Sequence, residues 1–123
     1  MLTNDTSIQK RYYISGNKFS GYGLLTLSKL PAYFFYYPYE STLMSRGLLV
    51  ADTCFNPRET HSGTFLVGNS HLESMNNPKA RKEQFDFVTE KLAGHDHIFA
   101  GDFNFDYDWY NESGSQLSKI AIK

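Results

Sequence analysis

A carboxylate and an amide stand two positions apart in residues 98–104 (IFAGDFN), directly after a short apolar run. In a strand, residues i and i+2 lie on one face, so Asp102 and Asn104 would project together, and Gly101 would let the backbone approach a neighbour closely. Asp102 could hold and partly deprotonate an attacking water, while the Asn104 amide could donate to a phosphate oxygen without adding charge. The pattern suits phosphate chemistry. Its alternative is a strand end at which the two side chains only cap a turn.

A histidine and a second carboxylate occur in residues 69–74 (NSHLES), at the end of another expected strand. His71 and Glu73 are again two positions apart on one face of that strand. Such a pair could bind phosphate, ligate a metal or support each other by hydrogen bonding, and its alternative is an ordinary surface pair. Arg46, just before a buried strand, could orient a carboxylate or be a surface charge.

Two further patterns contain metal-ligating residue types, but neither completes a site. Oxygen-bearing side chains alternate from Asp102 onward as they do in an EF-hand calcium loop. The sixth position of that loop, which requires glycine, is Tyr107, and the twelfth, which requires glutamate, is Ser113. In residues 95–97 (HDH), two histidines flank an aspartate without a third ligand at a suitable spacing, which favours a solvated turn.

Strands and one helix must position these residues. Apolar runs bounded by turn residues predict strands over 21–29, 33–37, 47–53 and 64–72, the last of them buried on both faces, and a short buried strand over 98–100. Asn77 and Pro78 begin a helix that Gly94 closes. The inward stripe of this helix is Arg81, Gln84, Phe85, Val88 and Leu92. The order of elements predicts a mixed α/β layer arrangement.

Composition limits the class of protein. The 123 residues make one domain, and 41% hydrophobic and 16% aromatic residues predict a packed core. A net charge of −1 gives no global basic field, so any phosphate binding must be local. We expect no membrane span and no signal peptide. The single cysteine, Cys54, is interpreted as a structural thiol, and without a disulfide an intracellular location, cytoplasmic or nuclear, is expected.

Taken in order, the segments GYGLLTLSK (21–29), SRGLLV (45–50), NSHLES (69–74), PKARKEQ (78–84) and IFAGDFN (98–104) resemble the endonuclease/exonuclease/phosphatase superfamily, which has the deoxyribonuclease I-like fold. The branch most similar is that of tyrosyl-DNA phosphodiesterases of the second type. The likeness spans residues 21–112. Each motif alone is weak, but their order and spacing together are specific.

The resemblance implies a four-layer α/β sandwich that uses Mg²⁺ or Mn²⁺ to hydrolyse phosphoesters, with nucleic acid the favoured substrate class. It implies that Asp102 positions the water nucleophile and assists the metal, that Asn104 contacts the scissile phosphate, and that His71 faces that phosphate. Arg46 would match an arginine that braces the metal-binding glutamate of the family. Asn69 and Glu73 are assigned supporting roles on the histidine strand.

Several family motifs have no counterpart in this sequence: the first strand with its Asn, the metal-binding Glu and the final catalytic His. A complete family domain is about twice as long. Residues 1–123 are therefore expected to be a partial domain, truncated at both ends, inactive alone and in need of missing segments or a partner chain. The alternative function is a non-catalytic relic or interaction module of the same fold, and a calcium-binding loop protein ranks third.

Overall fold

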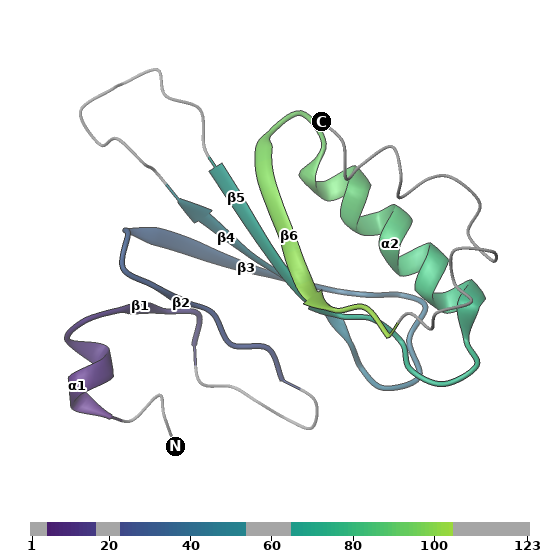
Figure 1. The fold of residues 1–123 in the computed structure, drawn as a ribbon, viewed down its shortest axis with the longest axis horizontal. Coiled ribbons are helices and arrows are strands. Elements are labelled where there is room, and N and C mark those ends of the chain that lie inside the picture. The colour runs from purple at the N-terminus through teal and green to yellow at the C-terminus, as the bar shows by residue number, and fades with distance from the viewer. Residues whose placement is uncertain (1–4, 17–22, 54–64, 105–123) are drawn as a thin grey trace.

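The computed structural model describes residues 5–16, 23–53 and 65–104. Its main element is a four-stranded mixed sheet in the order β3-β4-β5-β6, made of β3 (Ala32–Pro38), β4 (Gly47–Thr53), β5 (Phe65–His71) and β6 (Asp96–Asp102) (Figure 1). β3, β4 and β5 pair antiparallel. β6 runs parallel to β5, and helix α2 (Pro78–Leu92) makes the crossover between them. The predicted mixed α/β arrangement is confirmed as a mixed four-stranded sheet with one main helix.

Helix α2 begins and ends at the predicted residues because local signals define both ends. Pro78 occupies the first turn, and Gly94 follows the helix with a left-handed φ of 79°. Asn77 is the residue before the helix, but its side-chain amide donates to the carbonyl oxygen of Ser74 instead of capping the helix. The buried positions of α2 are the five predicted ones: Arg81, Gln84, Phe85, Val88 and Leu92.

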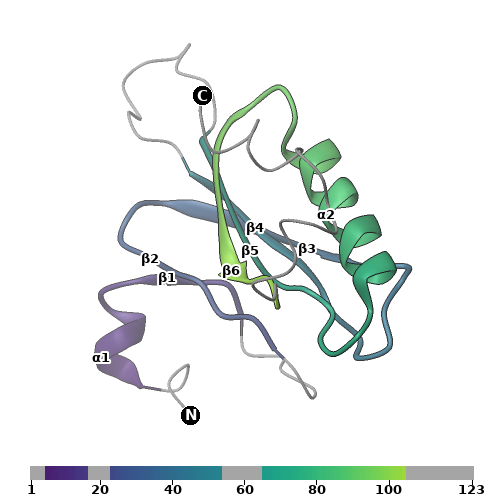
Figure 2. The same ribbon diagram turned by 45° about the vertical axis from the view of Figure 1, so that its right-hand side comes forward.

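Helix α2 lies over one face of the sheet (Figures 1 and 2), and the core is formed between them. Alternation along the strands decides which side chains enter it. On the opposite face, the Asn69 amide donates to the carbonyl oxygen of Leu25 at 3.2 Å, so the N-terminal segment contacts that side. The buried cluster consists of Tyr39, Leu48, Val50, Leu66, Leu72, Phe85, Val88 and Leu92.

We expect Val88→Ala to lower the free energy of unfolding by about 2 kcal/mol. The Val88 side chain is only 1% exposed, so the substitution removes two buried methyl groups and leaves a cavity. Urea unfolding followed by circular dichroism measures the effect. A change below 0.5 kcal/mol, about the size of a surface effect, would contradict the assignment of Val88 to the core.

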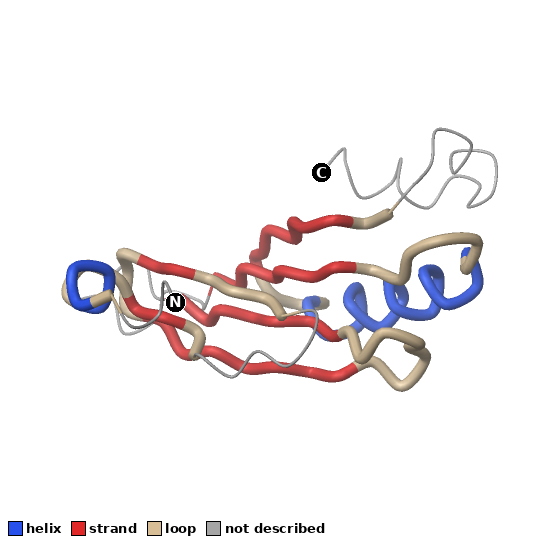
Figure 3. Tube along the Cα trace, turned by 90° about the horizontal axis from the view of Figure 1, so that it is seen from below, coloured by secondary structure: helices blue, strands red, loops and turns tan. Residues whose placement is uncertain are grey.

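Three strand predictions are corrected. The strand expected over 21–29 is only β2 (Leu27–Ser28), which pairs antiparallel with β1 (Tyr13–Ile14), and residues 21 and 22 lie outside the described residues. The Ser28 hydroxyl bonds to both the N–H and the carbonyl oxygen of Leu30, and this local turn ends the strand. The small N-terminal unit, with α1 (Thr6–Gln9), lies at one end of the main sheet (Figure 3).

The other two corrections concern burial. β5 alternates between buried residues on the α2 side and half-buried ones on the other, so it is not buried on both faces. β6 is longer than the predicted 98–100 and mostly exposed, because it is an edge strand of the described sheet. Asp96 and His97 accordingly belong to a strand and not to a turn, although both are exposed as expected.

Candidate functional site

The carboxyl ends of β5 and β6 meet at one edge of the sheet. His71 is the register partner of Asp102, because the two strands are parallel and pair from Phe65 with Asp96 onward. Register partners lie on the same face, and the His71 Nε2 atom lies 3.5 Å from the Asp102 Oδ2 atom. The side chains are 32% and 65% exposed, so this pair is open to a ligand. The fold thus brings together the two polar motifs that the sequence separates by about 30 residues.

Asn104 reaches the same place by a different geometry from the one predicted. β6 ends at Asp102, and Asn104 has a left-handed φ of 51°, so the two residues do not continue one strand face. The Asp102 Oδ1 atom accepts a hydrogen bond from the Asn104 N–H at 2.9 Å, which is the turn-capping contact of the alternative interpretation. The Asp102 Oδ2 atom still faces His71, so the carboxylate serves the turn and the pair together.

The backbone of Leu72 connects the two strand ends. Its N–H donates to the Asp102 carbonyl oxygen at 2.9 Å, and its carbonyl oxygen accepts the Asn104 Nδ2 at 2.8 Å. Arg46 Nη1 donates to the same carbonyl oxygen. Both lone pairs of the Leu72 oxygen are thereby used, and the position of Asn104 is tied to that of Arg46.

Gly101 makes this close approach of strands workable, as its sequence position predicted. Its φ is 153°, and a Cβ atom at this position would lie 1.8 Å from the backbone carbonyl oxygen of Ser70. No side chain can be accommodated there without separating the strands. The close packing of β6 against β5 therefore explains why a glycine precedes Asp102.

Glu73 does not share a surface with His71, contrary to the prediction of one strand face. β5 ends at His71, so the alternation of a strand no longer applies two residues later, and the Glu73 side chain is 1% exposed. Its Oε2 atom accepts from the Thr42 hydroxyl at 2.9 Å and the Leu43 N–H at 3.0 Å. Glu73 Oε1 lies 3.9 Å from Arg46 Nε and both side chains are buried, so Arg46 is paired with a carboxylate and is not a surface charge.

Burial opposes ionisation of Glu73, but hydrogen bonds outweigh it. The Leu43 N–H, the Thr42 hydroxyl, the charge of Arg46 and the Gln84 amide together hold the pKa of Glu73 below its usual value of 4.5. An ionised carboxylate is therefore fixed inside the protein. It is fully engaged by the protein and is not presented to a ligand.

Two polar residues of α2 hold the segment that follows β5. Arg81 Nη1 donates to the carbonyl oxygens of Glu73 and Met75, and Gln84 Oε1 accepts from the Glu73 N–H at 2.8 Å. Sequence reasoning placed both on the inward stripe of the helix but gave them no site role. Polar side chains at inward helix positions were the signal that could have indicated it, whereas nothing in the sequence marked Thr42.

Tyr39 adds a buried hydroxyl next to this edge, 2.6 Å from the Ser70 Oγ atom. Burial raises the pKa of Tyr39 to about 12, although the hydrogen bond with Ser70 lowers it.

The raised pKa of Tyr39 gives stability that is fully present below the ordinary value of 10.0 and is lost as pH rises through about 12. We expect a loss of about 3 kcal/mol over that range from this group, by the usual 1.4 kcal/mol per pKa unit. Urea unfolding between pH 8 and 12 measures it, and Tyr39→Phe, which lacks the ionising group, should show the shallower decline. Equal slopes in the two proteins would contradict this assignment.

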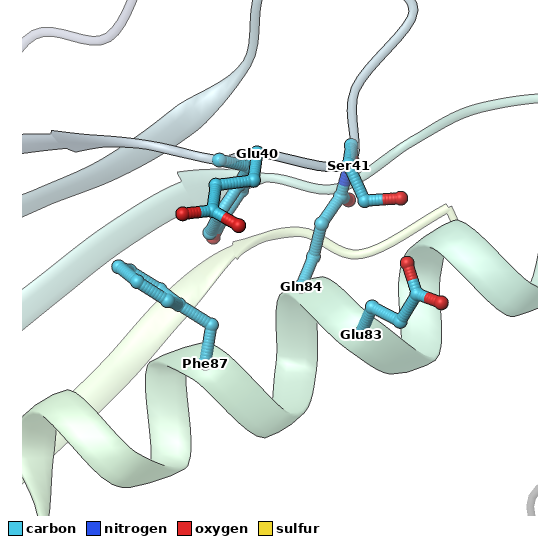
Figure 4. A pocket seen from close by; sticks show the side chains of 6 residues that line it. Glu40, Ser41, Glu83, Gln84 and Phe87 are labelled. Atoms are coloured by element: carbon cyan, nitrogen blue, oxygen red, sulfur yellow. The ribbon is translucent and has the colours of Figure 1, made fainter.

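A pocket of about 250 Å³ lies between α2 and the segment after β3 (Figure 4). Phe87, Gln84 and Glu83 come from the helix, and Glu40 and Ser41 from the opposite side. None of the three strand-end residues His71, Asp102 and Asn104 lines it. The pocket and the strand-end group are separate features, and the chemistry-bearing side chains belong to the second.

The described residues do not form a complete metal site. Within residues 5–16, 23–53 and 65–104, no three His, Cys, Asp or Glu side chains converge. Asp102 supplies one exposed carboxylate, and Glu73 is committed to protein donors. Most of the expected calcium loop, from residue 105 onward, lies outside the described residues, as does Cys54. Also within the described part, no helix is long and apolar enough to cross a membrane.

The sheet, the crossover helix and the two strand ends have the arrangement of part of the deoxyribonuclease I-like fold of the endonuclease/exonuclease/phosphatase superfamily. Within that fold the chain is similar to solved structures of TDP2. A humanized D. rerio TDP2 with 14 mutations aligns with a TM-score of 0.59 and 26% identity, over 88% of this chain and 46% of that one. D. rerio TDP2 complexed with a single strand DNA product gives 0.60 and 24%, over 86% and 44%. C. elegans TDP2 gives 0.58 and 20%, over 85% and 35%.

The chain therefore spans less than half of the length of these solved structures. No model of a protein family and no curated protein matches the sequence. The resemblance drawn from the motifs is confirmed at the level of structure.

Proposed function

We propose that this chain forms the central part of a metal-dependent phosphodiester hydrolase that acts on nucleic acid. One observation carries the proposal: the exposed His71–Asp102 pair, with Asn104 bonded to Asp102, lies at the shared end of two parallel strands. The DNA product bound to D. rerio TDP2 supports the substrate class. The proposal keeps the expected intracellular location, cytoplasmic or nuclear.

In this proposal each of the three side chains has a separate task. The Asp102 carboxylate orients the attacking water and withdraws its proton. The histidine and the Asn104 amide donate hydrogen bonds to the phosphate oxygens, where negative charge increases in the transition state. Asn104 keeps one amide N–H for this purpose, because its other contact is to the Leu72 carbonyl oxygen.

Mg²⁺ or Mn²⁺ is part of the proposal through the family resemblance. The described residues do not fit a complete site for such an ion, so the proposal places further ligands outside them, in other segments or in a partner chain.

The test is hydrolysis of bis-p-nitrophenyl phosphate with Mg²⁺ or Mn²⁺ by the whole protein that contains this chain, and by the purified chain. We expect metal-dependent turnover in the whole protein that Asp102→Asn and Asn104→Ala reduce to background. Asp96→Asn, an exposed aspartate at the other end of β6, is the matched control and should leave turnover unchanged. A folded whole protein without turnover would overturn the proposal and support the relic or interaction module instead.

A further inference from the structure

A buried polar network surrounds the segment that leaves β5 toward α2. Glu73, Arg46 and Gln84 are 1%, 3% and 1% exposed, and each bonds to this segment or is part of it. Gln84 bridges it to the segment after β3, because its Nε2 donates to the Ser41 carbonyl oxygen at 2.7 Å. Three structural units, the two strand connections and the helix, are thus joined by side-chain hydrogen bonds.

Within this network Glu73 is the central acceptor. Its carboxylate fixes the Thr42 hydroxyl, and the same hydroxyl accepts the Arg46 N–H at 3.0 Å. The carboxylate also lies beside the Arg46 guanidinium, whose Nη1 reaches the Leu72 carbonyl oxygen. Glu73 therefore positions Arg46 in two ways: the Arg46 N–H is held through Thr42, and the Arg46 guanidinium lies beside the Glu73 carboxylate.

A continuous path of hydrogen bonds leads from Arg46 to the candidate site. Arg46 and Asn104 both donate to the Leu72 carbonyl oxygen, and the Asn104 N–H donates to Asp102 Oδ1. We propose that Glu73 is a positioning residue for the candidate site. Through Arg46 and the Leu72 carbonyl oxygen, Glu73 fixes the orientation of Asn104 and Asp102. This inference rests on the proposed function.

Packing alone does not explain such a network. Burying an ion pair requires its desolvation, and apolar residues of similar volume often stabilise a protein as well or better. The borders of the network also contain the three non-glycine residues with left-handed backbones in the described part of the chain: Ser45, Met75 and Asn104. Unfavourable backbone conformations of this kind gather where surrounding contacts hold a functional geometry.

The experiment compares Glu73→Gln with Val88→Ala by NMR of the ¹⁵N- and ¹³C-labelled chain. Glu73→Gln keeps an acceptor for Thr42 but removes the charge beside Arg46, so we expect the Asn104 side-chain amide signals and the Asp102 carboxyl signal to shift. Val88→Ala destabilises the core but removes none of the hydrogen bonds of this path, so it should shift neither. Unchanged Asn104 and Asp102 signals in folded Glu73→Gln, or equal shifts in Val88→Ala, would overturn the inference.

Two further variants keep the test decisive. If Glu73→Gln does not fold, Thr42→Val removes one hydrogen bond from the carboxylate without changing its charge, and a smaller shift of the same signals is expected. In an Arg46→Met background, which lacks the donor to the Leu72 carbonyl oxygen, Glu73→Gln should add a smaller shift than it produces alone, because the side-chain part of the path runs through Arg46. The NMR readout needs no turnover, so a protein that fails to hydrolyse phosphodiesters and a Glu73 that fails to position Asn104 are distinguishable results.

Discussion

Glu73→Ala is expected to lower the free energy of unfolding by about 3–5 kcal/mol. The substitution leaves the Arg46 guanidinium buried without its carboxylate, and removes the acceptor of the Thr42 hydroxyl and the Leu43 N–H. Because the pKa of Glu73 is lowered in the folded protein, its contribution is present above the ordinary value of 4.5 and is lost as pH falls through the lower folded-state pKa. The difference between the two proteins should therefore shrink in acid. Urea unfolding at pH 7 and pH 3 measures both effects.

Glu83→Ala supplies the matched control for this prediction. Glu83 is an exposed carboxylate of α2 that pairs with Lys79 one turn earlier, at 3.9 Å. Exposed pairs of this type contribute about 0.5 kcal/mol, so the loss of this pair should have a small effect on the free energy of unfolding. If Glu73→Ala lowered the free energy of unfolding no more than Glu83→Ala, the buried network around Glu73 would not stabilise the protein as its burial indicates.

Gly101→Ala is expected to separate β6 from β5 and to cost more than about 4 kcal/mol, which is in the range of exceptional single substitutions. The added Cβ atom would lie 1.8 Å from the Ser70 carbonyl oxygen, a backbone atom that no rotamer change can move away. The φ of 153° is also one that alanine rarely adopts. Amide hydrogen exchange should show loss of protection in β6 first, while the β3–β4 pairing is retained.

Gly94→Ala separates the collision from the effect of backbone conformation. Gly94 also has a positive φ, 79°, but a Cβ atom there would meet nothing within 4 Å. Its substitution should cost only about 1 kcal/mol. Similar costs at the two glycines would mean that conformation and not the contact with Ser70 explains Gly101.

The sequence predicted those helices and strands whose residue pattern lies within the element itself. The stripe from Arg81 to Leu92 repeats with the period of a helix, and β4 (Gly47–Thr53) has turn residues at both ends, so both were found with their correct bounds. The exposure of Ile98, at 53%, could not be predicted, because it depends on β6 being an edge strand of the described sheet. Strand order is a property of the whole fold and is not encoded within seven residues.

The candidate site was predictable in its side chains but not in its connections. His71, Asp102 and Asn104 are residue types with evident chemistry at strand ends. Their link is the backbone of Leu72, which has the same carbonyl and N–H as every other residue and gives no signal in sequence. The separation of His71 from Glu73 likewise depends on where β5 ends, which hydrogen bonding to its neighbours decides.

The parallel pairing of β5 and β6 has a consequence for the order of folding. β3 and β4 close a connection of few residues, since Pro38 pairs with Gly47, whereas Phe65 of β5 must find Asp96 of β6 across the whole of α2. Closing the longer connection costs about 1 kcal/mol more in chain entropy, and the parallel pairing of β5 with β6 needs the crossover that contains α2. Refolding should therefore form the β3–β4 hairpin first and bring His71 to Asp102 last, so formation of the candidate site would report completion of the native state.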